Sequence, residues 1–243
     1  MNDAPNTAVL VPAAGRGTRL GGKRKQMRCL GDAPVLVQTL RAFERSPVVG
    51  ALVVAGPPEE TDALRSALGE TDLSKLRAVV AGGASRQASV RRAFAAAPAE
   101  EAEVFLVHDA VRPFVPAGRI RAVAEAARET GAAAPAVPAS DTLRRAEAER
   151  FTETVDRAGC FQMQTPQGFR RALLADAFAQ AEQQQRGAEE AATDDVGLVQ
   201  AAGHDVYRVD GDRRNFKITT PADWQLAQAL WPVWLEGSKG EEG

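Results

Sequence analysis

Short apolar runs alternate with amphipathic segments up to about residue 140, and this alternation constrains the fold more than any other feature. The apolar runs have the length of strands and lie at 8–12, 51–56, 77–83, 104–110 and 132–139. Segments with helical periodicity separate them, at 35–45, 59–68, 86–97 and 116–129. Strands that alternate with helices typically form a mostly parallel sheet with helices on both faces. The sequence therefore predicts a Rossmann-like α/β domain that binds its ligands at the carboxyl edge of the sheet.

This pattern breaks at 140–169, which is polar and rich in threonine and arginine. We interpret 139–159 as a protruding β-hairpin arm with its tip at 146–150, followed by a return to the sheet at 160–164. The remaining expected elements are a helix at 170–185, a Thr-capped helix at 193–203, strands within 205–211 and 214–220, and a helix from Pro221 with Thr220 as its N-cap. We expect one domain over 1–235 and a disordered tail over 236–243.

Composition excludes several classes of function. The net charge of -2 provides no broad basic surface for nucleic acid. No apolar stretch approaches the ~20 residues of a membrane span, and the N-terminus lacks the features of a signal peptide. Cys29 and Cys160 are the only cysteines, which fits a cytoplasmic protein without a disulfide framework. With only two histidines, we expect any metal to be a hard cation with oxygen ligands.

A glycine-rich turn, "PAAGRGTRLGGKRKQ", follows the first expected strand and has the character of a phosphate cradle. In the dinucleotide motif GxGxxG, Gly15 and Gly17 match but Leu20 stands in the third position. In the P-loop motif GxxxxGK[ST], Arg24 stands where the Mg²⁺-binding hydroxyl belongs. A tight turn with surface cations is the plain structural alternative, and it explains so many glycines and basic residues together less well.

The turn resembles the signature AAGxGxRMxxxxPKQ of the nucleotidyltransferases with the nucleotide-diphospho-sugar transferase-like fold. That resemblance implies contacts between a nucleoside triphosphate and the backbone of Ala13, Ala14, Gly15 and Gly17. It also implies that Arg19 and Lys25 stabilise charge on the phosphates. Two positions depart from the signature: Arg24 replaces the proline before the lysine, and Met27 follows the glutamine.

Six further segments narrow the resemblance to one family, the 2-C-methyl-D-erythritol 4-phosphate cytidylyltransferases. They are "AGGASRQASV" (81–90), "VHDAVRPF" (107–114), "SDTL" (140–143), "VDRAGCFQMQTPQGF" (155–169), "TDDVGLV" (193–199) and "NFKITTPAD" (215–223). The resemblance spans about residues 8 to 230. It implies transfer of CMP from CTP to methylerythritol phosphate, with release of pyrophosphate, in the non-mevalonate route to isoprenoids.

The residue types suit this chemistry on physical grounds. Transfer at phosphorus depends mainly on positioning and on stabilisation of charge, which Arg19, Lys25 and Lys217 supply as the expected catalytic residues. Asp109 follows a buried strand and suits Mg²⁺ or a ribose, because Mg²⁺ prefers few carboxylates together with phosphate oxygens and water. A strand-end helix cap is the alternative role of Asp109. We expect His108 to be a packed residue, since the attacking phosphate carries no proton that must be removed.

The segment after the third strand is the expected base-binding site. The resemblance implies that Gly82, Gly83 and Ser89 contact cytosine. Its alternative role, a helix N-terminus capped by Ser85, is compatible with the first.

The arm is expected to complete the second substrate site. In the family it reaches across a two-fold interface, so the resemblance implies a homodimer in which the arm contacts the partner's polyol phosphate. The expected substrate-binding residues are Arg112, Thr142, Arg157, Thr165 and Thr193. Taken singly, Arg157 is better explained as a surface cation of a hairpin, and Thr142 and Thr165 by β-propensity. Inside the DT and VDR motifs at the spacing of the family, we favour the substrate-binding role.

Two other hypotheses stay open. The chain could be a cytidylyltransferase for another polyol phosphate such as ribitol 5-phosphate. The sequence distinguishes these substrates mainly through the residues of the arm. The chain could also be a nucleotide-sensing regulator without catalysis, although the retained set of Arg19, Lys25, Asp109 and Lys217 disfavours this.

Overall fold

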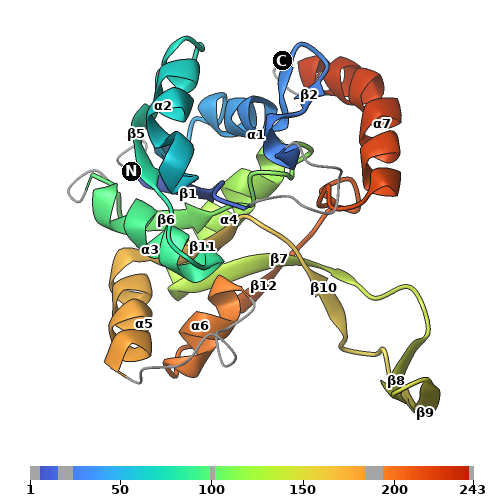
Figure 1. Cartoon of the computed structure of the whole chain (residues 1–243). Helices are drawn as coiled ribbons and strands as arrows, with labels where there is room; N and C mark the ends of the chain where they lie inside the picture. The colour runs from blue at the N-terminus through green and yellow to red at the C-terminus, as the bar shows by residue number, and fades with distance from the viewer. Residues whose placement is uncertain (1–5, 16–23, 99–101, 184–193, 241–243) are drawn as a thin grey trace.

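A central sheet organises the molecule in the computed structural model, which describes residues 6–15, 24–98, 102–183 and 194–240 (Figure 1). The strand order is β10-β7-β11-β6-β1-β4-β5, and β12 also pairs with β7. The parallel strands that carry the first half of the sheet are β1 (Thr7–Pro12), β4 (Val49–Gly56), β5 (Leu76–Ala81) and β6 (Val104–Val107). The predicted α/β fold with a mostly parallel sheet is therefore confirmed.

The second half of the sheet is mixed. β11 (Gln167–Arg170) lies between β6 and β7 (Ala132–Pro138) and is antiparallel to both. β10 (Phe161–Met163) is antiparallel to β7, and β12 (Tyr207–Asp210) is parallel to it. The strand expected at 214–220 is wrong, because these residues form no strand. The side chain of Ile218 is instead buried against the last helix.

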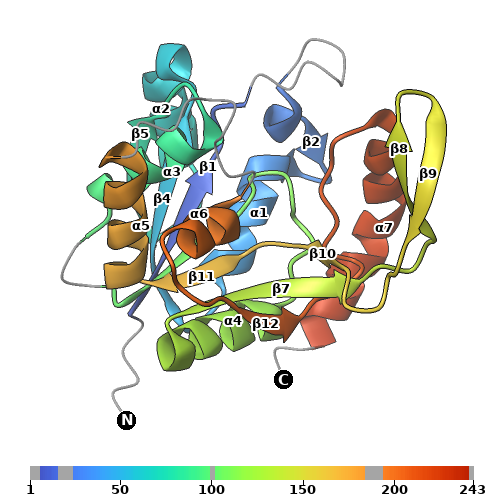
Figure 2. The ribbon, with the colours of Figure 1, turned by 90° about the horizontal axis from the view of Figure 1, so that it is seen from below.

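Helices cover both faces of the sheet, as the sequence predicts (Figures 1 and 2). Alternating side chains of β1 show the division: Val9 and Val11 belong to one core, and Ala8 and Leu10 belong to the other. The first core includes residues of α1 (Val35–Glu44), α2 (Thr61–Gly69) and α4 (Ala117–Thr130). The second includes residues of α3 (Arg86–Ala96), α5 (Arg171–Gln183) and α6 (Asp195–Ala201).

A third apolar cluster joins the C-terminal helix α7 (Pro221–Gly240) to a small hairpin. The hairpin consists of β2 (Cys29–Leu30) and β3 (Ala33–Pro34). Gly31 turns it with a φ of +68°, and a Cβ at this position would lie 2.2 Å from Nε1 of Trp231. The hairpin follows the short 3-10 helix η2 (Lys25–Met27), so α7 supports the chain that leaves the glycine-rich turn.

The structure tests three expectations about the ends of α6 and α7. Oγ1 of Thr220 accepts a hydrogen bond from the backbone N–H of Asp223 at 3.2 Å, which confirms the predicted cap of α7. The Thr cap of α6 is wrong, because Asp194 is the N-cap and its carboxylate accepts from the N–H of Gly197. The disordered tail is wrong for 236–240, which α7 includes, and 241–243 lie outside the described residues.

The arm forms as predicted. β8 (Leu143–Glu147) and β9 (Arg150–Val155) pair as a separate two-stranded sheet that projects from the body of the molecule (Figure 1). Nearly all of its side chains are exposed. Within the described ranges, no helix is long and apolar enough to cross a membrane.

Candidate active site

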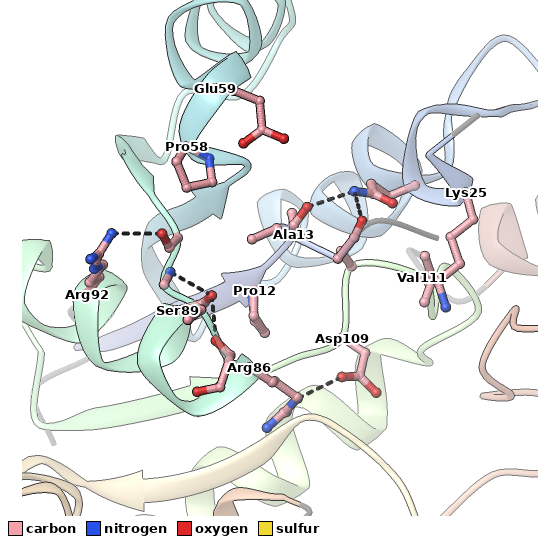
Figure 3. Close-up of a pocket in the computed structure, with 18 of the residues that line it drawn as sticks. Pro12, Ala13, Lys25, Pro58, Glu59, Arg86, Ser89, Arg92, Asp109 and Val111 are labelled. Carbon is pink, nitrogen blue, oxygen red and sulfur yellow. Dashed lines mark hydrogen bonds and ion pairs between the residues drawn. The ribbon is translucent and has the colours of Figure 1, made fainter. Parts of the chain in front are cut away.

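A cleft of about 810 Å³ opens where β1, β4, β5 and β6 end, which is the predicted edge of the sheet (Figure 3). Its walls come from segments far apart in the sequence: the glycine-rich turn, the loop after β4, the segment after β5, the loop after β6, and Lys217. The predicted site residues that line it are Ala13, Ala14, Gly15, Lys25, Gly82, Gly83, Ser89, Asp109 and Lys217. Gly17 and Arg19 lie outside the described residues.

One wall is formed by the described ends of the glycine-rich turn, 12–15 and 24–26, which hydrogen bonds hold in place. The N–H of Ala13 donates to the carbonyl of Ala55 at 2.8 Å. Nε2 of the buried Gln26 donates to the carbonyls of Ala13 and Gly15, at 2.7 and 3.1 Å. Lys25 therefore reaches the cleft from η2, a turn that Gln26 ties back to β1. The role of Gln26 was missed, although the Lys-Gln pair of the signature contains it.

The opposite wall is the segment after β5, where the chain passes close to the turn. A Cβ at Gly82 would lie 2.5 Å from Cβ of Ala14 and 2.9 Å from the carbonyl of Gly56, so only glycine fits. Oγ of the buried Ser89 donates to the carbonyl of Ser85 at 2.9 Å and accepts from the N–H of Gly83 at 3.0 Å. The Ser89 hydroxyl thus shapes this wall.

The start of α3 has the predicted cap, and the helix also carries Arg92, a cleft residue that the sequence interpretation missed. Ser85 caps α3 by accepting from the N–H of Ala88 at 3.0 Å, which confirms that expectation. Arg92, three residues after Ser89, donates to the carbonyl of Gly82 at 2.7 Å and lines the cleft. Spacing of three on a helix places both side chains on one face, and this periodicity is the signal that could have found Arg92.

Asp109 lies at the floor of the cleft among three cations. Its Oδ2 is 3.1 Å from Nζ of Lys217 and 3.2 Å from Nε of Arg112, and its Oδ1 is 3.3 Å from Nε of Arg86. Burial raises the pKa of Asp109, but the charges of Lys217, Arg86 and Arg112 outweigh burial and hold the pKa well below its ordinary range. Asp109 is therefore ionised at neutral pH and orients the cations around it.

A second carboxylate lies behind this group. Nη1 of Arg86 is 2.6 Å from Oδ2 of Asp195, whose side chain is only 1% exposed. Burial raises the pKa of Asp195, although the charge of Arg86 opposes the change. Burial lowers the pKa of Arg86, but the carboxylates of Asp195 and Asp109 outweigh it and the pKa is raised. Arg86 and Asp195 stand inside motifs that the resemblance quotes, yet their pairing across the sequence gave no local signal.

Thr165 and His108 support Asp109 from below. The N–H of Asp109 donates to Oγ1 of Thr165 at 3.2 Å, and this hydroxyl is 3.0 Å from Nδ1 of His108. His108 is fully buried with its ring against Phe43, and burial lowers the pKa of His108 to about 4. The expected packed histidine is confirmed. Thr165 is also buried, and its role in substrate binding stays a prediction.

The other predicted substrate-binding residues do not line the cleft. Arg112 bridges Asp109 and the carbonyl of Asn215, the latter at 2.7 Å from Nη1. Thr142 is exposed at the base of the arm. Arg157 is also exposed there and donates to the carbonyl of Ser140. Thr193 lies outside the described residues.

The cleft can therefore bind a polyanion. Glycine-lined walls allow close approach of a flat base, and Lys25, Arg86, Arg92 and Lys217 bring positive charge to the same space. In the described part of the chain, no group of three or more histidines, cysteines or carboxylates could hold a metal ion alone. A bound cation would need oxygen ligands from the substrate.

Comparisons with known proteins agree with this geometry. A family model described as "IspD: 2-C-methyl-D-erythritol 4-phosphate cytidylyltransferase" matches residues 7–232. The chain belongs to this family. It is 56% identical over 230 residues to the cytidylyltransferase of Salinibacter ruber, with 94% of each chain covered. The corresponding protein of Deinococcus radiodurans is 45% identical, over 93% of this chain and 90% of that one.

Solved structures of the family share the fold. The crystal structure of the 2-C-methyl-D-erythritol 4-phosphate cytidylyltransferase from Thermus thermophilus superposes with a TM-score of 0.76 at 39% identity. The match covers 93% of this chain and 99% of that one. Membership in the cytidylyltransferase family thus rests on sequence and structure over nearly the whole chain.

Proposed function

We propose that this protein transfers CMP from CTP to 2-C-methyl-D-erythritol 4-phosphate and releases pyrophosphate. The main support for this proposal is that Lys25, Lys217 and Asp109 line the same cleft, between two glycine-lined walls. These residues come from three separate motifs of a cytidylyltransferase family to which the chain belongs.

The reaction exchanges one P–O bond for another. A phosphate oxygen of the polyol phosphate attacks the α-phosphorus of CTP, and the bond from that phosphorus to the bridging oxygen of the β-phosphate breaks. Pyrophosphate leaves with the bonding electron pair, and no proton must be removed from the attacking phosphate. The protein contributes position and charge: Lys25 and Lys217, with Arg19 as a further expected catalytic residue, stabilise negative charge that grows at the phosphates.

Different parts of the cleft bind different parts of the nucleotide. The backbone of Ala13, Ala14 and Gly15 faces the triphosphate, with Gly17 expected to extend this contact, and Gly82 and Gly83 admit the cytosine. Ser89 holds the second wall in shape. Arg112 remains a candidate for the polyol phosphate, because it pairs with Asp109, which lines the cleft.

Mg²⁺ is the expected cofactor. Asp109 fits it, since this one ionised carboxylate at the cleft floor is the type of ligand that Mg²⁺ combines with phosphate oxygens and water. When bound, the ion would neutralise charge on the triphosphate. The chain's own residues keep Asp109 ionised and oriented.

We also propose that the protein is a homodimer joined through the arm at 139–159. A lone two-stranded hairpin is marginal in water, and it gains stability by packing on a symmetric copy. Phe151 on the arm and Phe161 and Met163 on β10 are exposed apolar side chains, and burying them against a partner would favour association. In such a dimer Thr142 and Arg157 would complete the partner's polyol-phosphate site, with Thr165 and Thr193 beside it.

We propose a cytoplasmic location for the protein. The cysteines Cys29 and Cys160 are both free, which suits a reducing compartment. Neither membrane nor nucleic acid is an expected partner.

Pyrophosphate release tests the reaction directly. We expect turnover only when CTP, 2-C-methyl-D-erythritol 4-phosphate and a divalent cation are all present. A parallel assay replaces 2-C-methyl-D-erythritol 4-phosphate by ribitol 5-phosphate. Turnover with ribitol 5-phosphate alone would assign the chain to the cytidylyltransferases that act on that substrate. Undiminished turnover in excess EDTA would refute the role of the cation, and nucleotide binding without turnover would favour a regulator.

A further inference from the structure

One arginine links two segments that form walls of the cleft, the end of the glycine-rich turn and the loop after β4. Nη2 of Arg24 lies 2.5 Å from Oε1 of Glu59, and Nε lies 3.0 Å from Oε2 of Glu60. Arg24 directly precedes η2, and both glutamates belong to the 3-10 helix η3 (Pro58–Glu60) after β4. The Arg24 side chain is only 16% exposed, whereas both glutamates are more than half exposed. We call Arg24, Glu59 and Glu60 the Arg24 clamp.

The clamp acts on Lys25 through the chain. Lys25 follows Arg24, and both Lys25 and Glu59 line the cleft (Figure 3). On its other side, Lys25 is followed by Gln26, which is bonded to the carbonyls of Ala13 and Gly15. The backbone of Lys25 is therefore anchored on both sides, to η3 by Arg24 and to the glycine-rich turn by Gln26. Since η2 is a single short turn, it has little stability of its own to replace a lost anchor.

The shape of the guanidinium explains why two partners can share it. Two of its nitrogens point at separate carboxylates, and Nη1 is buried without a hydrogen-bond partner among the described residues. A lysine ammonium is a single point of charge and reproduces only part of this geometry. Ion pairs with exposed carboxylates add little to global stability, so the clamp is expected to matter chiefly for local position.

We propose that Arg24 is a positioning residue for the catalytic Lys25. This inference rests on the proposed cytidylyltransferase function. By holding η2 against η3, the clamp keeps the Lys25 ammonium where charge grows at the phosphates. Small displacements of a catalytic group cost much of the rate even when binding persists. The competing explanation is simple neutralisation, in which Arg24 only cancels two negative charges beside a site for triphosphate.

Steady-state kinetics of four variants separate the two explanations. The set is Arg24→Met, the double variant Glu59→Gln/Glu60→Gln, the triple combination, and Arg24→Lys. If the clamp positions Lys25, Arg24→Met and the glutamate variant each lower kcat about tenfold, with little change in the KM for CTP. The triple variant is no slower than either, because each of these variants already breaks the ion pairs of the Arg24 clamp. Arg24→Lys recovers part of the loss.

A control variant and a stability measurement show whether a lower kcat is specific to the Arg24 clamp. Arg65 pairs with Asp62 at 2.5 Å on α2 but does not line the cleft, so Arg65→Met should leave kcat unchanged. The melting temperature of every variant should stay within a few degrees of the wild type, about the shift expected from a surface pair.

Two results would overturn the proposal. One is a wild-type kcat in Arg24→Met. The other is a higher KM for CTP in Arg24→Met together with unaltered kinetics in the glutamate variant, which is the outcome of neutralisation. Absence of turnover in the wild type would instead refute the proposed function, so the two failures are distinct.

Discussion

The cleft and the arm contain similar ion pairs in opposite surroundings. In the cleft, Nη1 of Arg86 is 2.6 Å from Oδ2 of Asp195, whose side chain is almost fully buried. In the arm, Nε of Arg145 is 2.7 Å from Oε1 of Glu153, and these side chains are 71% and 61% exposed. The contact distances hardly differ, but both side chains are exposed to water only in the second pair. Equal geometry therefore does not imply equal energy.

The two regions are ordered by different kinds of contact. The cleft is ordered by contacts within one chain, because Asp195, Arg86, Asp109 and Lys217 form one connected series of charges. The arm has its own ladder of strand hydrogen bonds but exposes most of its side chains. In the proposed dimer, another subunit supplies the surface against which the residues of the arm take part in a site.

Breaking the buried pair should have the largest effect. Arg86→Met leaves the Asp195 carboxyl buried without its partner, and we expect the free energy of unfolding to fall by about 3–5 kcal/mol. Urea denaturation measures this change. Adding Asp195→Asn to the same variant should restore part of the loss, since the buried group is then neutral. A loss below about 0.5 kcal/mol, the size typical of surface substitutions, would contradict the view that the cleft is internally ordered.

Removing the lysines should affect rate more than binding. Lys25→Ala and Lys217→Ala are each expected to lower kcat on the order of 10²–10³-fold, because their charge is most useful in the transition state. Arg19→Ala is expected to behave alike. Arg121→Ala, an exposed cation on α4, is the control and should change nothing. Wild-type kcat with only a higher KM for CTP would show that the assigned roles are wrong.

The two regions also differ in how far the sequence predicted them. Apolar runs of strand length and helical patterns placed β1, β4, β5, β6 and the helices between them, because these elements are set by local burial. The antiparallel β11 was not predicted as a strand. Its pairing partners lie about 60 and 35 residues before it in the chain, and a short segment of sequence does not show which strands it will pair with. The series Arg86–Asp195 and the support by Gln26 were missed for the same reason.

The pH dependence of stability should report the buried histidine beneath the floor of the cleft. Burial lowers the pKa of His108 from 6.5 to about 4. Between these values the unfolded chain binds the proton and the folded chain does not, so stability falls as the pH decreases from 6.5 to 4. The shift corresponds to about 3 kcal/mol.

Urea denaturation at pH 7 and at pH 4.5 measures this dependence. His108→Gln should weaken it, since glutamine does not titrate in this range. The arm contains no histidine, so variants of its residues should leave this pH dependence as it is. An equal dependence in wild type and His108→Gln would assign the effect to other groups.

Subunit mixing tests whether the arm serves a neighbouring cleft. Arg157→Ala and Lys25→Ala proteins should each be nearly inactive, and co-refolding should restore about one quarter of wild-type activity. Half of the dimers formed at random are mixed, and one of the two sites in a mixed dimer carries both intact residues. Refolding each variant alone is the control. If mixed dimers form but stay inactive, the arm serves the cleft of its own chain.

The exposed arm pair should give the smallest effect. Arg145→Ala removes a contact as short as the buried one, yet we expect the free energy of unfolding to change by less than about 0.5 kcal/mol, because water solvates both charges in either state. Urea denaturation at low protein concentration, with Arg86→Met alongside, measures the contrast. A loss above about 1 kcal/mol that disappears on further dilution would mean that a second subunit covers the arm and shields the pair. The contrast between the two regions would then hold for the single chain alone, and the assembled protein would have two buried ionic networks.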